Sequence, residues 1–237
     1  MSQNSKRENQ NKCYWCGETA IGVEHVPPQN LFPKGHREEL IKVYACKKHN
    51  QDLSKIDERI RVHMISMSHA SEIAQKQFYE KVIRGLKRKE SLGLATDLVE
   101  NQFKNYEGKG YWREKSIYID TYFEKIIRGL CFYHFELQIK GSTHYFSDKM
   151  ELINLSANAH FYYWELEKEY FGNWIEGNPK NKKVFDYKYY FSKDESRFFV
   201  IMKFYETHKV IGVSIPEGKS IEDYGLDIEK YLNIKLE

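Results

Sequence analysis

The sequence predicts an α+β protein in which a small zinc-bound module comes first, helices follow, and a small antiparallel β-meander comes last. Three of the four cysteines lie within residues 12–61, as in a loop-rich module cross-linked by a metal ion. No proline occurs between Pro33 and Pro179, which favours helices because proline interrupts them. Beyond Pro179, segments rich in aromatic and β-branched residues alternate with short polar breaks, the pattern of consecutive strands.

The composition is that of a folded, soluble chain. Of the 237 residues, 41% are hydrophobic, and the 18 Tyr and 14 Phe exclude a disordered chain because aromatic residues indicate packed surroundings. No segment approaches the roughly 18 consecutive apolar residues of a membrane span, and the charged N-terminus lacks the apolar core of a secretory signal. We therefore expect a cytoplasmic protein with no membrane partner. In that reducing compartment, paired cysteines hold metal more often than they form disulfides.

Four regions are predicted along the chain. They are a disordered leader (1–11), the zinc-bound module (12–61), a mostly helical region (62–175) and an antiparallel β-region with a short C-terminal helix at 220–232 (176–237). The leader is predicted from its polar and charged residues, which offer no apolar surface to bury.

Two segments, 52–89 and 118–139, carry apolar residues every three or four positions, which indicates one buried helical face in each. In the first segment these residues are Ile56, Ile60, Met64, Met67 and Ile73. In the second they are Tyr122, Ile126, Leu130 and Phe135. A third helix is predicted at 148–170.

Three strands are predicted after Pro179, at 184–191, 197–206 and 209–215. Their many aromatic side chains are interpreted as core residues in preference to a platform for stacking nucleic-acid bases. Residues 118–237 point to no chemistry of their own, and we expect them to contact a protein partner, to form a homodimer or to gate the N-terminal module.

Two short motifs carry ligands for zinc. Cys13 and Cys16 form a C-x2-C pair, and Cys46 and His49 form a C-x2-H pair after the intervening residues 17–45. The four donors suit tetrahedral Zn²⁺, and Gly17 would ease the first turn. Burial as small apolar residues is the alternative for cysteines; it accounts for Cys131 within the aromatic helix but not for the paired spacing.

A further run of residues lies between and after these pairs. The run Glu24-His25-Val26-Pro27-Pro28 precedes the second pair, and Asn50 follows it directly. This order resembles the HNH endonucleases that have a C-x2-C, E-H-x-P-P, C-x2-C-N arrangement, over about residues 13–61. The resemblance implies that residues 12–61 form an HNH nuclease module of the ββα-metal type, in which a β-hairpin and a helix hold a divalent ion.

The resemblance also implies the roles of single residues. His25 would be the general base that activates water, which needs an imidazole that is neutral near pH 7. Glu24 and Asn50 would bind the catalytic Mg²⁺ or Mn²⁺ through oxygen. The predicted activity is metal-dependent hydrolysis of phosphodiester bonds in DNA, in phage defence or a mobile element.

The sequence departs from the family pattern at two positions. His49 replaces the usual cysteine, and Glu39 stands where relatives carry an asparagine that orients the base. A catalytically inactive, zinc-stabilised module that binds nucleic acid or protein is therefore one alternative, and an RNA-cleaving toxin is another. Asp57 is interpreted as a solvated acid in the first turn of a helix in preference to a further metal ligand.

Nucleic acid is the predicted partner, with DNA as the first choice and RNA as the alternative. The net charge of +3 permits such binding without indicating it. Candidate phosphate contacts come from basic residues in and after the second pair: Lys47, Lys48, Lys55, Arg59 and Arg61.

Overall fold

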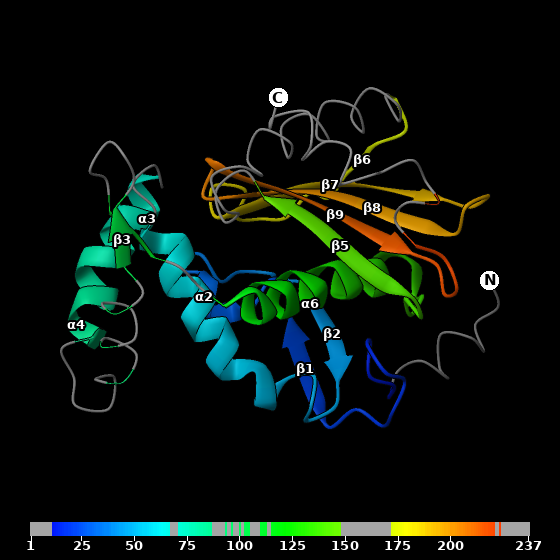
Figure 1. Cartoon of the computed structure of the whole chain (residues 1–237), viewed down its shortest axis with the longest axis horizontal. Helices are drawn as coiled ribbons and strands as arrows, with labels where there is room; N and C mark the ends of the chain where they lie inside the picture. Colours follow the sequence, from blue (N-terminus) through cyan, green and yellow to red (C-terminus); the bar gives the residue numbers. More distant parts are fainter. Residues whose placement is uncertain are drawn as a thin grey trace.

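The computed structural model shows a mixed helix and sheet architecture, so the predicted α+β class is confirmed (Figure 1). It describes residues 11–66, 71–86, 93, 96, 100, 102–104, 110–112, 115–147, 172–220 and 223. The predicted leader at 1–11 lies outside these residues except for Asn11, and so do the predicted helix at 148–170 and nearly all of the one at 220–232.

The N-terminal part is a β-hairpin followed by a helix. Strands β1 (Gly22–His25) and β2 (Lys42–Ala45) pair antiparallel, and the long loop between them contains the short helix η1 (Gln29–Leu31). The turn η2 (Gln51–Leu53) leads into helix α2 (Ser54–Ser66). Helix α2 therefore continues past the predicted module boundary at residue 61.

The region predicted to be mostly helical also contains strands. The helices that follow α2 directly are α3 (Glu72–Gln77), the π-helical turn η3 (Phe78–Val82) and α4 (Ile83–Leu86). Strands β3 (Gln102–Lys104) and β4 (Gly110–Trp112) form a separate hairpin, and β5 (Ser142–Ser147) joins the large sheet. The strands were missed because each is short and carries no period-two run of apolar residues.

Helix α6 (Ser116–Phe135) is the central element of the fold. It lies between the β1–β2 hairpin and the large sheet, and it packs against α2, β2, β5 and β9 (Figure 1). The predicted helical face is confirmed, because Tyr122, Ile126 and Leu130 are fully buried. The helix ends where Glu136 adopts a left-handed conformation with φ of 55°. In the described part of the chain, no helix is long and apolar enough to cross a membrane.

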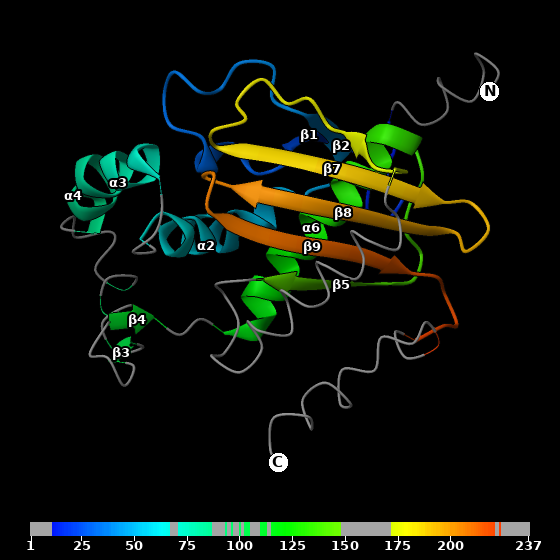
Figure 2. The same cartoon turned by 90° about the horizontal axis from the view of Figure 1, so that it is seen from above.

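The large sheet has five antiparallel strands in the order β5-β9-β8-β7-β6, seen face-on in Figure 2. Strands β7 (Phe185–Ser192), β8 (Arg197–Phe204) and β9 (His208–Ile215) form the predicted meander, with each end within two residues of its predicted position. Strand β6 (Ile175–Glu176) adds one short edge and β5 adds the other. The prediction that the aromatic strands are core is confirmed, since Phe198 and Phe204 are fully buried.

One continuous apolar core joins the hairpin to the sheet through α6. It includes Tyr14 and Leu31 from the N-terminal part, Phe123 from α6 and Val200 from β8. The phenol of Tyr205 donates a 2.5 Å hydrogen bond to the carbonyl of Leu31 across this boundary. The N-terminal part is thus packed into the rest of the protein, and side chains of α6 lie beside it.

Gly129 marks the closest approach of α6 to the hairpin. A Cβ atom at this position would lie 2.6 Å from Cγ2 of Val26. We therefore expect Gly129→Ala to lower the free energy of unfolding by about 1–3 kcal/mol, even though alanine is the better helix former. A Cβ atom at Gly85 in α4 would have no atom within 4 Å. Gly85→Ala should therefore raise the free energy of unfolding by up to about 1 kcal/mol. Urea unfolding of both variants measures the contrast, and equal effects would contradict the close approach.

Candidate metal centre and catalytic residues

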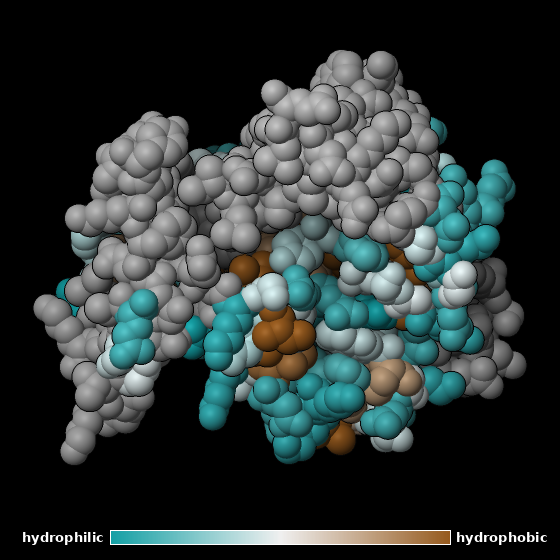
Figure 3. Space-filling view, viewed as in Figure 1, coloured by the Kyte–Doolittle hydropathy of each residue, from teal (hydrophilic) through white to brown (hydrophobic). Residues whose placement is uncertain are grey.

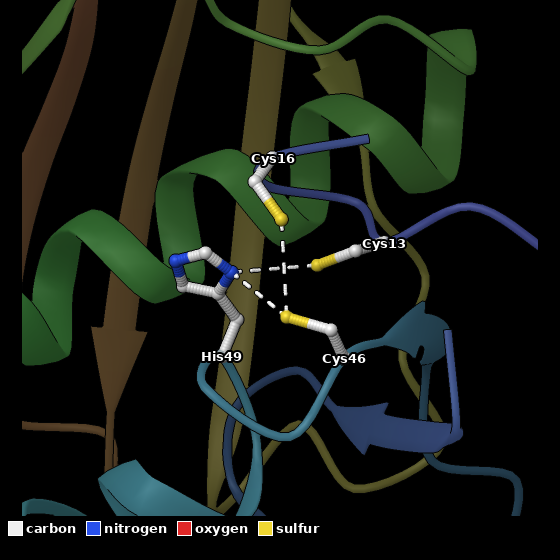
Figure 4. A group of neighbouring side chains, drawn as sticks. All are labelled: Cys13, Cys16, Cys46 and His49. Carbon is white, nitrogen blue, oxygen red and sulfur yellow. Dashed lines mark hydrogen bonds between the residues drawn. The ribbon is translucent and has the colours of Figure 1, made fainter. Parts of the chain in front are cut away.

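The four predicted zinc ligands come together at one point (Figure 4). Their donor atoms all lie within 4.8 Å of one another. Cys13 Sγ is 3.5 Å and Cys46 Sγ 3.3 Å from Nδ1 of His49, and the sulfurs of Cys16 and Cys46 are 3.8 Å apart. These distances match a tetrahedral zinc site, because Zn–S bonds of about 2.3 Å and Zn–N bonds of about 2.0 Å place the donors about 3.5–3.8 Å apart. The donor set and its geometry fit a structural zinc ion.

Local backbone structure prepares the first pair of ligands. Gly17 has a φ of 77°, which favours glycine, and its N–H donates to the carbonyl of Cys13 at 3.0 Å. Burial would raise the pKa of the Cys13 thiol, but backbone hydrogen bonds at Cys16, Cys46 and Trp15 outweigh it and lower the pKa. The thiolate form that binds metal is thereby favoured.

Cys131 is the contrasting case. It is buried in α6, where burial raises the pKa of its thiol to about 12. It lies outside the four-residue cluster, as predicted.

Residues of helix α6 and of the segment after it contact the Cys13-Cys16-Cys46-His49 cluster. Trp15 stacks on the His49 ring with a centroid distance of 4.6 Å, and the Arg128 guanidinium lies 5.2 Å from the centre of Trp15. Arg128 is held in turn by Glu124 at 2.8 Å. Nε2 of Gln138, beyond the helix, donates a 2.6 Å hydrogen bond to the carbonyl of Cys13. Residues of the second half of the chain therefore fix both ligand pairs.

The β1–β2 hairpin places His25 on its outer face. His25 pairs with Lys42, and Val23 pairs with Tyr44, so these four side chains share one face of the hairpin. Val23 is 44% and Tyr44 40% exposed. In Figure 3, the coloured surface in the part of the view where Figure 1 shows β1 and β2 is mainly hydrophilic and includes a brown, apolar group.

The His25 ring is half-buried and makes no side-chain hydrogen bond with the described residues. Burial, followed by the charges of Lys42 and Arg37, lowers the pKa of its imidazole. The ring is therefore neutral near pH 7, the form that accepts a proton.

Glu24 lies on the opposite, inner face of the hairpin. The residue is 6% exposed, and Oε1 lies 3.3 Å from Nζ of Lys125 in α6. The same ammonium lies 2.7 Å from Oδ2 of Asp57 in α2. Asp57 is thus buried and ion-paired, so its interpretation as a solvated acid is wrong: the first turn of α2 faces α6 at this residue.

Burial dominates the electrostatics of this inner group. It raises the pKa of Glu24 to about 7, with Asp57 adding to the effect and Lys125 opposing it. Burial also raises the pKa of Asp57, again against Lys125. Burial raises the pKa of the Tyr14 and Tyr122 phenols, and the negative charges of Glu24 and Asp57 raise it further. Ionising either carboxylate therefore reduces stability, a feature that functional sites share with structural ion pairs.

A pH dependence of stability follows from Glu24. The pKa of Glu24 is about 7 in the folded protein and about 4.5 in the unfolded chain. The folded state therefore favours the protonated carboxyl, and this contribution to stability is lost as the pH rises from about 4.5 to about 7. The wild type should therefore lose about 3 kcal/mol relative to Glu24→Gln between pH 4.5 and pH 7.5.

Denaturant unfolding of zinc-loaded protein across pH 5–8.5 would measure most of this difference. Because both proteins carry the zinc cluster, its own pH dependence cancels. Glu217→Gln, at an exposed position, is the matched control and should show no such trend relative to wild type. A Glu24→Gln curve parallel to that of the wild type would contradict the assignment.

Asn50 lies against the strand that carries His25. Its Nδ2 donates a 2.9 Å hydrogen bond to the carbonyl of Val23, and Oδ1 makes no hydrogen bond with the described residues. Asn50 and the other two predicted catalytic residues, Glu24 and His25, are thus grouped at β1, although Glu24 and His25 point to opposite faces.

The predicted phosphate contacts divide into two groups. Lys47, Lys48 and Lys55 are exposed, with Lys47 in an exposed ion pair with Asp52. The two arginines are more enclosed: Arg59 lies 5.2 Å from the ring centre of Tyr118, and Arg61 is paired with Glu58. Lys42 and Arg37, beside His25, were not among the predicted contacts.

Glu39 occupies an unusual backbone position. Its φ is 46°, in the left-handed region that asparagine tolerates better than glutamate. Its side chain is exposed and lies 3.7 Å from Lys180. In the described residues, no hydrogen bond or ion pair joins Glu39 to His25.

Lys125 is the residue of this site that the sequence analysis missed. Tyr122, Lys125, Ile126 and Gly129 follow the three- and four-residue spacing of the buried face of α6. A single lysine on such a face is the signal that could have identified it, since lysine is almost never fully buried without a charged partner.

Comparison with known proteins gives no further identification. The sequence matches no protein-family model, no curated protein and no solved structure. The family resemblance therefore depends on the motifs themselves.

Proposed function

We propose that this protein is an HNH-type endonuclease that hydrolyses phosphodiester bonds in DNA with a divalent metal ion. The observation that carries the proposal is the hairpin-and-helix unit β1–β2–α2 beside the zinc cluster, with His25 at the end of β1. Strand, strand and helix follow in the order that the family resemblance implies. Defence against phage or a mobile element is the setting that we propose by analogy.

His25 acts as the general base. Its ring nitrogens are available to a water molecule, and the lowered pKa keeps the imidazole ready to accept the proton. The neighbouring Lys42 adds a positive charge on the same face of the hairpin, where a phosphate would approach.

Glu24 and Asn50 hold the catalytic Mg²⁺ or Mn²⁺. Oε1 of Glu24 contacts Lys125 and accepts the N–H of His25 at 3.0 Å, which leaves Oε2 for an ion. Asn50 uses Nδ2 in its bond to β1, which leaves the carbonyl Oδ1. Both are hard oxygen donors, as these ions require. When bound, the ion stabilises negative charge on the scissile phosphate and the leaving oxygen.

One observation favours a second candidate function. Glu24 already has a cationic partner in Lys125, as expected if the module has lost its metal and binds nucleic acid or protein without cleaving it. Exposed lysines at 47, 48 and 55 would serve such binding equally well.

Cleavage assays on dialysed, zinc-loaded protein test the proposal. Plasmid DNA, single-stranded DNA and RNA of the same sequence are each incubated with no added ion, with Mg²⁺ or with Mn²⁺. We expect cleavage of DNA only with an added ion. RNA cleavage with intact DNA would make the protein a ribonuclease, and binding without cleavage under all conditions would favour the second candidate.

A further inference from the structure

Lys125 is a buried cation shared by two carboxylates from separate elements. Its side chain is 1% exposed, and its Nζ lies 2.7 Å from Asp57 and 3.3 Å from Glu24. With all three groups ionised, one positive charge faces two negative charges, and the group keeps a net charge of −1. The lysine thus compensates the acids only in part.

Several buried polar atoms in this part of the protein lack hydrogen-bond partners. Asp57 Oδ1 and the hydroxyls of Tyr14 and Tyr122 are buried and have no hydrogen-bond partner among the described residues. Both tyrosines are fully buried, and both respond to the charges of Glu24 and Asp57. Buried polar groups are almost always paired in folded proteins, so these unpaired oxygens are open to a further ligand.

The chemistry of the group also suits a divalent cation. Carboxylates and phenolic oxygens are hard donors of the kind that bind such ions. Lysine has a flexible four-carbon stem and can move its ammonium over several ångströms. Its contact with Asp57 is shorter than that with Glu24, so Asp57 is the partner that it would keep.

We propose that Lys125 is a tethered cation that occupies the place of a divalent ion beside Glu24, and that it withdraws to Asp57 when the ion binds. The inference depends on the proposed function for the assignment of Glu24 to the metal. Lys125 is a positioning residue in this scheme: it holds Glu24 on the inner face of β1 and competes with the ion for its carboxylate.

Manganese binding to the full-length, zinc-loaded chain tests the inference without a nuclease assay. Free Mn²⁺ is titrated by electron paramagnetic resonance, and thermal unfolding is recorded with and without Mn²⁺. Lys125→Met removes the charge and keeps the length of the side chain. We expect it to bind Mn²⁺ roughly tenfold more tightly than wild type and to gain more thermal stability from the ion.

Three further variants keep the experiment decisive. Lys125→Met combined with Asp57→Asn removes one acid with the lysine, which avoids two uncompensated buried charges if the single variant unfolds. It should still bind Mn²⁺ more tightly than wild type, and adding Glu24→Gln should abolish the gain. Lys140→Met removes an exposed charge just beyond α6 and should leave Mn²⁺ binding unchanged.

The outcomes separate this inference from the proposed function. Tighter Mn²⁺ binding by the Lys125 variants without any cleavage would support the tethered cation and count against the nuclease. Metal-dependent cleavage by wild type, with Mn²⁺ affinity unchanged in both Lys125 variants, would overturn the tethered cation and leave the nuclease standing.

Discussion

Cys46→Ser is expected to remove the zinc ion and to leave the protein unfolded at 37 °C, so that no cooperative thermal unfolding transition is seen. Zinc bound at such sites contributes about 10–16 kcal/mol in small zinc-binding peptides, which is as large as the whole stability of a typical domain. Cys46 closes the cluster between β2 and His49, and the core of the hairpin is continuous with α6. Loss of the ion should therefore disturb the whole core. Elemental analysis and thermal unfolding measure the two effects.

Cys131→Ala is the matched control for this variant. Cys131 is as buried as Cys13 and Cys46 but lies in α6 outside the cluster. We expect about one zinc per chain to remain and a loss of only about 1 kcal/mol. Zinc retained at wild-type level in Cys46→Ser would contradict the metal centre.

His25→Ala is expected to lower the rate of DNA cleavage by about 10²–10⁴-fold, the usual contribution of a general base. The ring is half-buried on the outer face of the hairpin and makes no hydrogen bond with the described residues, so folding and zinc content should be unaffected. Initial rates on plasmid DNA at saturating Mg²⁺ measure the effect.

His144→Ala is the control for this second variant. His144 lies on β5 at the edge of the large sheet, and its substitution should leave the rate within about twofold of wild type. Cleavage by a folded, zinc-loaded His25→Ala at the wild-type rate would show that another group acts as the base.

Local patterns predicted much of the fold because they depend on neighbours in the chain. The three- and four-residue spacing of Tyr122, Ile126 and Leu130 identified α6, and aromatic and β-branched runs identified β7, β8 and β9. Strand β5 was missed because its six residues, Ser142–Ser147, are mostly polar or half-buried at an edge of the sheet. Its place there depends on pairing with β9, which is distant in the sequence.

The candidate zinc site could also be predicted from the sequence, because the spacing within each ligand pair is a local pattern. Two ligands separated by two residues must approach one ion from a single turn, so the spacing of Cys13 and Cys16 already contained the geometry. The pairing of the two motifs across residues 17–45 was a hypothesis from donor chemistry, and the distances between the four donor atoms support it.

The inner side of β1 depended on contacts between distant segments. The sequence placed Glu24 beside His25. The helical spacing marks Lys125 as a lysine on a buried face, but it does not show that Glu24, about one hundred residues earlier, and Asp57 are its partners. Asp57 was misinterpreted because burial is a property of the packed helices and cannot be read from the first turn of one.

The amino-acid sequence alone therefore predicted the four candidate zinc ligands, helix α6, the β-meander and the candidate general base. The tertiary fold specified which charges meet, because α6 packs between the hairpin and the sheet and carries Lys125 and Arg128 to the N-terminal module. Such long-range electrostatic contacts have no period in the sequence. They arise only when apolar burial brings separate elements together and leaves the charged side chains among them to find partners.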